Sequence, residues 1–144
     1  MSNKSMEIIV LDEGRSLVTG GAFRKVLYLT KNKNIFVLKG DILCSINYSG
    51  FLNFHLEKDV FTSFVLVLIS RFDSGGVKIR ENGRIFEFIN RDEYRDELGK
   101  LSFMNICIHI LKKEIFYLLS QKKKFLQKYN VFSSLVRVKS ATAI

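Results

Sequence analysis

Short runs of apolar residues, broken by polar turns, fill the first 57 residues of the chain. Five of these runs are rich in β-branched and aromatic residues, which is typical of strands, and they cover residues 6–11, 24–30, 34–39, 42–47 and 50–56. Gly, Asn and Asp residues separate the runs. Strands joined by such tight turns predict an antiparallel sheet that meanders or closes into a barrel or jelly roll.

After this first part the pattern changes and helices are expected to dominate. Residues 60–72 fit a helix, although their β-branched content leaves a strand as the alternative. The Asn-Gly dipeptide at 82–83 is a strong two-residue turn signal and predicts a hairpin over 77–89. A charged helix is expected over 91–98. The sequence thus predicts one α+β domain over 1–144, with 1–57 mainly β and 58–144 helical apart from the hairpin.

The segment 101–119, LSFMNICIHILKKEIFYLL, is expected to form a long apolar helix late in the chain. On a helical wheel its apolar side chains cover roughly 220°, whereas a helix facing one core needs about 100°. Such a helix can pack on its own domain and still offer a stripe to a second copy of the chain. The predicted dimerisation stripe is Ile106, Ile110 and Tyr117. The alternative is a central core helix that is covered on both sides.

Composition and cysteine usage are those of an ordinary globular protein. The chain has 47% hydrophobic and 26% charged residues, and no apolar run approaches the 18–20 or so residues that span a bilayer. The N-terminus lacks the features of a signal peptide, so a cytoplasmic protein without membrane contact is expected. Cys44 and Cys107 show no CxxC spacing and are interpreted as reduced core residues.

The net charge of +9 is concentrated at the C-terminal end of the chain. Residues 121–144 carry six basic side chains and no acidic one. A basic tail can attract phosphate groups. Lysines at 122–124 can equally be the end of a helix, where positive charge meets the negative end of the helix dipole. The tail lacks the interleaved aromatic residues of a single-strand binder.

The sequence contains no recognisable catalytic motif. There is no GxSxG, HExxH, Walker or GxGxxG pattern. The two histidines, His55 and His109, have no second metal ligand at helical spacing, so neither is predicted to bind a metal. The acidic cluster within 91–98 is interleaved with arginines and is typical of a solvated helix face. We therefore expect no enzyme activity, no catalytic residue, no metal and no cofactor.

Four stretches carry a resemblance to a known family, and they cover residues 31–59, 60–73, 82–98 and 112–144. The order of strand, turn, apolar segment, hairpin and late basic helix resembles the N-terminal domain of enterobacterial AraC-type transcription regulators of the VirF/Rns/GadX-like virulence group. The resemblance implies a jelly-roll-like barrel followed by helices. It also implies a non-enzymatic regulatory module that senses a small effector, such as a fatty acid, and dimerises through its late helix.

The family's C-terminal helix-turn-helix domain has no counterpart in the sequence. The implied partners are therefore a second copy of the chain or a full-length relative with which it forms a heterodimer, and no direct sequence-specific DNA binding is expected. A fatty-acid head group needs a basic side chain at the mouth of the barrel. The candidates near predicted strand ends are Arg24, Lys39 and His55.

Two other functions stay open at this point. A small basic DNA- or RNA-binding protein of winged-helix type would use the hairpin at 77–89 as its wing. Against it, the segment 101–119 is too apolar to lie in a nucleic-acid groove. The second is an interaction protein of a phage or plasmid with an unrelated barrel.

Overall fold

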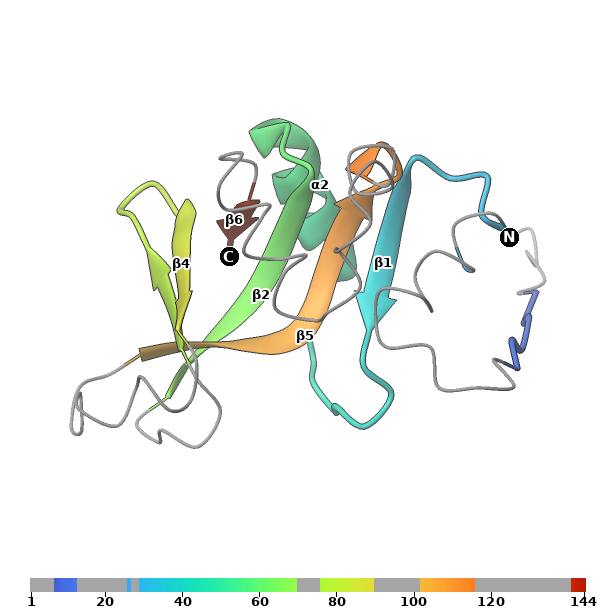
Figure 1. Cartoon of the computed structure of the whole chain (residues 1–144), viewed down its shortest axis with the longest axis horizontal. Helices are drawn as coiled ribbons and strands as arrows, with labels where there is room; N and C mark the ends of the chain where they lie inside the picture. The colour runs from blue at the N-terminus through green and yellow to red at the C-terminus, as the bar shows by residue number, and fades with distance from the viewer. Residues whose placement is uncertain (1–6, 13–25, 27–28, 70–75, 90–101, 116–140) are drawn as a thin grey trace.

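A six-stranded mixed sheet with one helix packed against it forms the described part of the chain (Figure 1). The structure is a computed structural model that describes residues 7–12, 26, 29–69, 76–89, 102–115 and 141–144. Its elements, in chain order, are β1 (Asn34–Leu38), α2 (Tyr48–Lys58), β2 (Thr62–Ile69), β3 (Gly76–Ile79), β4 (Ile85–Ile89), β5 (Ser102–Lys112) and β6 (Ala141–Ala143).

Strand β5 is the centre of the sheet. The strand order is β4-β3-β5-β2-β6, and β1 also pairs with β5. One edge of β5 pairs antiparallel with β2 along most of its length. The other edge pairs with β1 through residues 108–112 and with β3 at Phe103. The pair β2–β6 is parallel and joins segments that lie far apart in the sequence.

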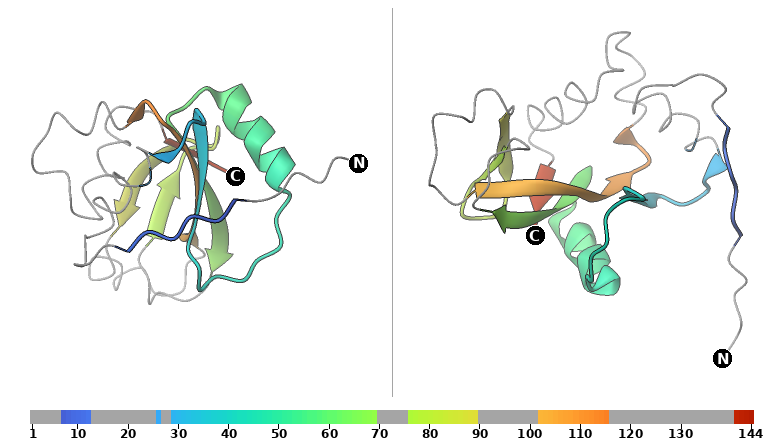
Figure 2. Two further views of the ribbon diagram at one scale, coloured as in Figure 1. Left: turned by 90° about the vertical axis from the view of Figure 1, so that its right-hand side faces the viewer. Right: turned by 90° about the horizontal axis from the view of Figure 1, so that it is seen from below.

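Side chains of β5 are buried on both faces of the sheet. Ile108 and Ile110 point to the face that α2 covers, where they pack with Phe51 of the helix. Leu111 points to the opposite face and packs with Phe64. Figure 2 shows the helix on one side of the sheet only. Residues 108–111 are buried on both faces, and this part of β5 is apolar apart from His109, as is typical of central strands.

Helix α2 forms because its first turn is capped and its buried residues lie one turn apart. The side chain of Asn47 accepts a hydrogen bond from the backbone N–H of Gly50 at 2.9 Å, as an N-cap residue does. Phe51 and His55, four positions apart, are the buried residues of the helix. Asp59 ends the helix in the left-handed conformation with φ 46°.

Strand β6 is held against the β3–β4 hairpin as well as against β2. The turn between β3 and β4 contains Gly83 at φ 78°, in the hairpin region that the sequence predicts. The carbonyl oxygen of Gly83 accepts hydrogen bonds from the N–H of Ala143 at 2.9 Å and from the hydroxyl of Thr142 at 3.2 Å. The hairpin turn therefore fixes the position of the chain's last residues.

The predicted fold class, an α+β chain with a β-barrel half followed by a helical half, is wrong. Residues 102–112 of the expected long helix form β5, and residues 62–69 of the expected earlier helix form β2. Conversely, the predicted strand 50–56 lies within α2. Periodicity alone does not separate a strand that is buried on both faces from a buried helix, and here the β-branched residues of both segments favoured the strand.

Two further predictions depend on residues 1–57. The segment 42–47 shows the alternating burial expected of a strand, but it pairs with no strand among the described residues. Residues 7–12 are described and form no strand.

Most of the predicted strand 24–30 and all of the predicted helix 91–98 lie outside the described residues, as does the basic tail from 121 to 140. In the described part of the chain, no helix is both long enough and apolar enough to cross a bilayer.

Candidate functional site at the junction of β1 and β5

Two irregular segments meet where β1 ends. The first is the turn Lys39–Ile42, which follows β1 directly and is closed by a hydrogen bond from the N–H of Ile42 to the carbonyl of Lys39 at 3.2 Å. The second is a bulge in β5 that begins at Asn105. They are neighbours because Leu38, the last residue of β1, pairs with Ile108 of β5. We call these two segments together the β1–β5 junction.

The turn carries a close pair of opposite charges. The ammonium of Lys39 lies 2.7 Å from a carboxylate oxygen of Asp41, and both side chains are more than half exposed. The hydrogen bond from Lys39 lowers the pKa of the Asp41 carboxyl, and the same contact raises the pKa of the Lys39 ammonium. Both groups are therefore charged near neutral pH. Both groups are exposed, so a ligand can reach them. An exposed pair of this kind adds little stability, so the fold loses little if a ligand separates the two groups.

The bulge in β5 holds a residue in an unfavourable backbone conformation. Between the pairs Phe64–His109 and Leu66–Asn105, β2 advances two residues while β5 advances four. Within the bulge Cys107 adopts φ 58°, where an L-residue costs about 1–2 kcal/mol. The side chain of Asn105 accepts a hydrogen bond from the N–H of Cys107 at 2.8 Å and so stabilises the bulge. Strained backbone of this kind is concentrated at functional sites.

The bulge also changes the direction of β5. Figure 1 shows the strand bending along its length, between the part beside β1 and the part beside β3. Asn105, Ile106 and Cys107 are each only half-buried, whereas Ile108 beyond the bulge is fully buried. The half-buried bulge therefore lies beside the exposed turn after β1, and Cys107 makes a small electrostatic contribution to the raised pKa of Lys39.

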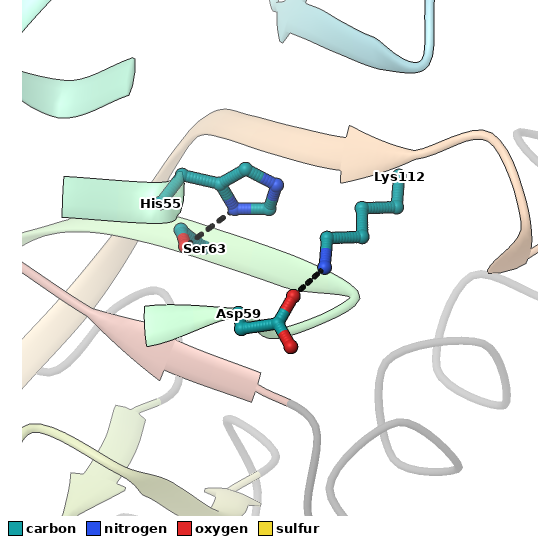
Figure 3. Close-up of polar contacts among 4 residues, drawn as sticks. All are labelled: His55, Asp59, Ser63 and Lys112. Carbon is teal, nitrogen blue, oxygen red and sulfur yellow. Dashed lines mark hydrogen bonds and ion pairs between the residues drawn. The ribbon is translucent and has the colours of Figure 1, made fainter. Parts of the chain in front are cut away.

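A second polar cluster lies under the C-terminal end of α2 (Figure 3). The ring Nδ1 of His55 and the hydroxyl of Ser63 on β2 share a buried hydrogen bond of 2.8 Å. Asp59 forms an ion pair with Lys112 at the end of β5, and the hydrogen bond from Lys112 lowers the pKa of the Asp59 carboxyl. His55 and Ser63 are both 0% exposed, so this pair fixes the helix to the sheet and is closed to a substrate, whereas the Asp59 side chain is exposed at the surface.

The structure separates the predicted pocket residues. Lys39 lies in the exposed turn of the β1–β5 junction, whereas His55 is enclosed between α2 and β2. Burial lowers the pKa of His55 to about 4, and the nearby Lys112 acts in the same direction, so this ring is neutral and cannot hold an anionic head group. Arg24 lies outside the described residues.

The predicted dimerisation stripe does not exist as a helical stripe. Ile106 lies in the bulge of β5 and Ile110 is fully buried beneath α2, so Ile110 cannot contact a second molecule while the sheet is intact. Tyr117 lies outside the described residues. Dimerisation itself stays a prediction.

Sequence reasoning missed Asp41, Asn105 and Cys107. A weak signal existed for Asp41, because Gly40-Asp41 follows a predicted strand directly, but it was interpreted only as a turn. Asn105 and Cys107 gave no signal, since the segment around them was interpreted as a helix. Within the described residues no group of three or more His, Cys, Asp or Glu side chains could hold a metal ion.

The fold is similar to many solved structures, two of which are of HddC. The crystal structure of HddC from Yersinia pseudotuberculosis matches with a TM-score of 0.67 and 19% sequence identity, over 92% of this chain and 55% of that chain. The crystal structure of the same protein complexed with GMP-PN matches with a TM-score of 0.66 and 18% identity over the same shares. This chain therefore spans about half the length of HddC. At this identity the likeness shows the fold alone.

Comparisons of the sequence itself gave no relative. No family model matches the chain, and no curated protein matches it. The resemblance of the sequence to AraC-type regulators therefore stays a prediction.

The observed fold, which is similar to that of HddC, contradicts the functions inferred from the sequence. A mixed sheet centred on β5 with one packed helix among the described residues is neither the barrel-and-helices architecture of an AraC-type effector and dimerisation module for transcription control nor the architecture of a winged-helix nucleic-acid-binding protein. The expectation that the chain is not an enzyme is contradicted by the same likeness. That expectation depended on the absence of short catalytic motifs. Such motifs identify only sites whose residues have a fixed spacing in the sequence.

Proposed function

We propose that this chain binds a nucleotide together with Mg²⁺ at the β1–β5 junction, as part of an enzyme that acts at a nucleotide phosphate. The observation that carries the proposal is the match of 92% of the chain to HddC, which was solved in a complex with GMP-PN. The GMP in this ligand's name denotes a guanosine phosphate, so a guanine nucleotide is the first ligand to test.

The charged pair of the turn fits a nucleotide phosphate bound with a metal. An exposed lysine ammonium is a strong donor to phosphate oxygens, and Lys39 is the only basic residue of the turn Lys39–Ile42. Asp41 offers a carboxylate with a lowered pKa. Mg²⁺ is usually bound by one or two carboxylates plus the phosphates of the substrate rather than by a full set of protein ligands. A single described carboxylate is therefore compatible with such a site.

This arrangement supports transfer of a nucleotidyl or phosphoryl group. Such reactions need the charge of the phosphate oxygens to be neutralised and the reacting groups to be held in line. Lys39 would supply positive charge directly, and Asp41 would hold the metal that supplies more. The bulge at Cys107 would place backbone groups beside the ligand at a position where the β-ladder is interrupted.

Binding of GMP in the presence of Mg²⁺ tests the site. We expect Lys39→Ala and Asp41→Asn each to raise the dissociation constant about tenfold or more, because a charged hydrogen bond contributes about 1.5–3 kcal/mol. For Asp41→Asn the loss should disappear when Mg²⁺ is replaced by EDTA, since its carboxylate acts through the metal. Isothermal titration calorimetry measures all of these constants.

The matched control is Lys78→Ala. Lys78 forms an exposed ion pair with Glu87 at 3.0 Å across the β3–β4 hairpin, similar in length and exposure to the pair in the turn. This variant should bind GMP as the unaltered chain does. If all three variants bind equally well, or if the unaltered chain does not bind GMP with Mg²⁺, the proposal is wrong.

A further inference from the structure

Two aromatic side chains are exposed among the described residues. Tyr48, the first residue of α2, is 44% exposed, and Phe86 of β4 is 43% exposed. The guanidinium of Arg80 lies over the ring of Phe86, 5.4 Å from its centroid. Tyrosine is enriched at binding surfaces because it combines a large apolar ring with a polar hydroxyl. The exposed ring of Tyr48 is therefore a candidate contact for a ligand.

The ring of Tyr48 is positioned by β1 and by the capped start of α2. Its centroid lies 5.9 Å from that of Phe36 on β1, and the two rings are inclined at 74°. In an edge-to-face contact of this kind, at most one face of the Tyr48 ring is covered. The N-cap residue Asn47 fixes the backbone directly before it. The ring is therefore held in place while at least one of its faces is left for a ligand by this contact.

One apolar cluster under α2 connects Tyr48 with the β1–β5 junction. Phe36 packs on this cluster, and so do Ile42 of the turn and Ile106 of the bulge. Phe36 precedes Lys39 by three residues, which span about 10 Å in a strand. The ring of Tyr48, which contacts Phe36, is therefore separated from Lys39 by a distance comparable with the length of one nucleotide.

Burial alternates along the segment that joins the turn to α2, and Figure 2 shows this segment passing from the end of β1 to the start of the helix. The inward side chains pack on the cluster under α2, and they are Ile42, Cys44 and Ile46. The outward side chains are exposed, and they are Asp41, Leu43, Ser45 and Asn47. A ligand on the outward side can therefore meet charged groups at the turn and an aromatic ring at the helix.

We propose that the ring of Tyr48 stacks on the base of the nucleotide whose phosphate binds at the β1–β5 junction. This inference rests on the proposed function and adds a contact for the part of the ligand that a charged turn does not hold. Every base has a π-face, so stacking on an aromatic side chain is tolerant of the base's identity. Tyr48 therefore contributes affinity for a nucleotide over a free phosphate, rather than a choice among bases.

Calorimetric titration of the full chain with GMP and Mg²⁺ tests the role of Tyr48. We expect Tyr48→Leu to raise the dissociation constant about tenfold, which is the size of a lost stack between a base and an aromatic ring. Tyr48→Phe keeps the ring and should recover nearly all of the affinity. Added salt should reduce the effect of Lys39→Ala, because salt screens charges, but it should leave the effect of Tyr48→Leu unchanged.

Phe86→Leu is the matched control, since it removes an aromatic side chain of nearly the same exposure from the β3–β4 hairpin. This variant should bind GMP as the unaltered chain does. The inference is overturned if Tyr48→Leu binds GMP as tightly as Phe86→Leu, or if Tyr48→Phe loses as much affinity as Tyr48→Leu. In both cases the losses expected for Lys39→Ala and Asp41→Asn still test the phosphate site by themselves. An unaltered chain that does not bind GMP would overturn the proposed function and this inference together.

Discussion

The two histidines of the chain are both buried. In the sequence analysis, His55 was a candidate for the mouth of a barrel and His109 was placed within a predicted helix. Instead His55 is enclosed against Ser63, and His109 lies on the face of β5 where its ring is 5.5 Å from that of Phe64. A neutral imidazole can be accommodated in a core. Treating histidine as a polar residue in the sequence pattern therefore did not predict that these two side chains are buried.

Burial of these rings predicts that the protein loses stability in mild acid. Burial lowers the pKa of each histidine to about 4, whereas both should titrate near 6.5 in the unfolded chain. The unfolded state therefore takes up more protons between pH 6.5 and 4. Over that window we expect the free energy of unfolding to fall by up to about 3 kcal/mol for each histidine.

Urea unfolding followed by circular dichroism at pH 7.0, 5.5 and 4.5 measures this loss. In a His55→Leu variant, about half of the pH dependence should disappear, whatever its stability at pH 7.0. A free energy of unfolding that stays constant between pH 6.5 and 4.5 would show that the rings are accessible to protons in the folded state.

At the candidate site, single residues were predictable only where the chemistry is local. Lys39 was selected from the sequence as a basic residue at a strand end, which is where it lies, although for a different ligand. Asp41 is its neighbour in the same turn and could have been selected by the same argument. The conformation of Cys107 depends on the shift in pairing register between β2 and β5. A register shift between two strands cannot be predicted from the local sequence of one of them.

Among the elements, those with the strongest local signals were placed best. Asn82-Gly83 lies at the turn between β3 and β4, and the apolar run 34–39 contains β1. Helix α2 was missed because its alternating residues suggest a strand, and its cap at Asn47 was overlooked. Residues 102–112 were misassigned because a strand covered on both faces has the same broad apolar pattern as a buried helix.

The turn between β3 and β4 gives a prediction for a single element. A Cβ at Gly83 would lie 3.0 Å from the carbonyl oxygen of Ala143, and the φ of 78° disfavours any side chain. Gly83→Ala should therefore lower the free energy of unfolding by about 1–2 kcal/mol and speed hydrogen exchange in β6. Chemical denaturation and hydrogen exchange give the two readings.

Gly40→Ala provides the control for that substitution. A Cβ at Gly40 meets nothing within 4 Å, so its free energy of unfolding should stay within about 0.5 kcal/mol of the unaltered chain. Equal losses for the two variants would mean that β6 is not held by the hairpin turn.

For the whole molecule, the decisive contacts join residues that are distant in sequence. Strand β5 brings together β1, β2 and β3, and β6 pairs with β2 across nearly 80 residues. Local patterns predict elements but not their partners, and an error in one central strand changed the whole predicted architecture. The corrected fold places an exposed charged turn beside a strained bulge, at the end of β1.

The most direct test of this account is a nuclear magnetic resonance titration of the ¹⁵N-labelled chain with GMP and Mg²⁺. We predict that the largest changes in amide chemical shift occur at Lys39–Ile42 and Asn105–Cys107, while amides of the β3–β4 hairpin remain unchanged. Changes confined to other parts of the chain, or no changes at saturating GMP, would contradict the assignment of the β1–β5 junction as a nucleotide site.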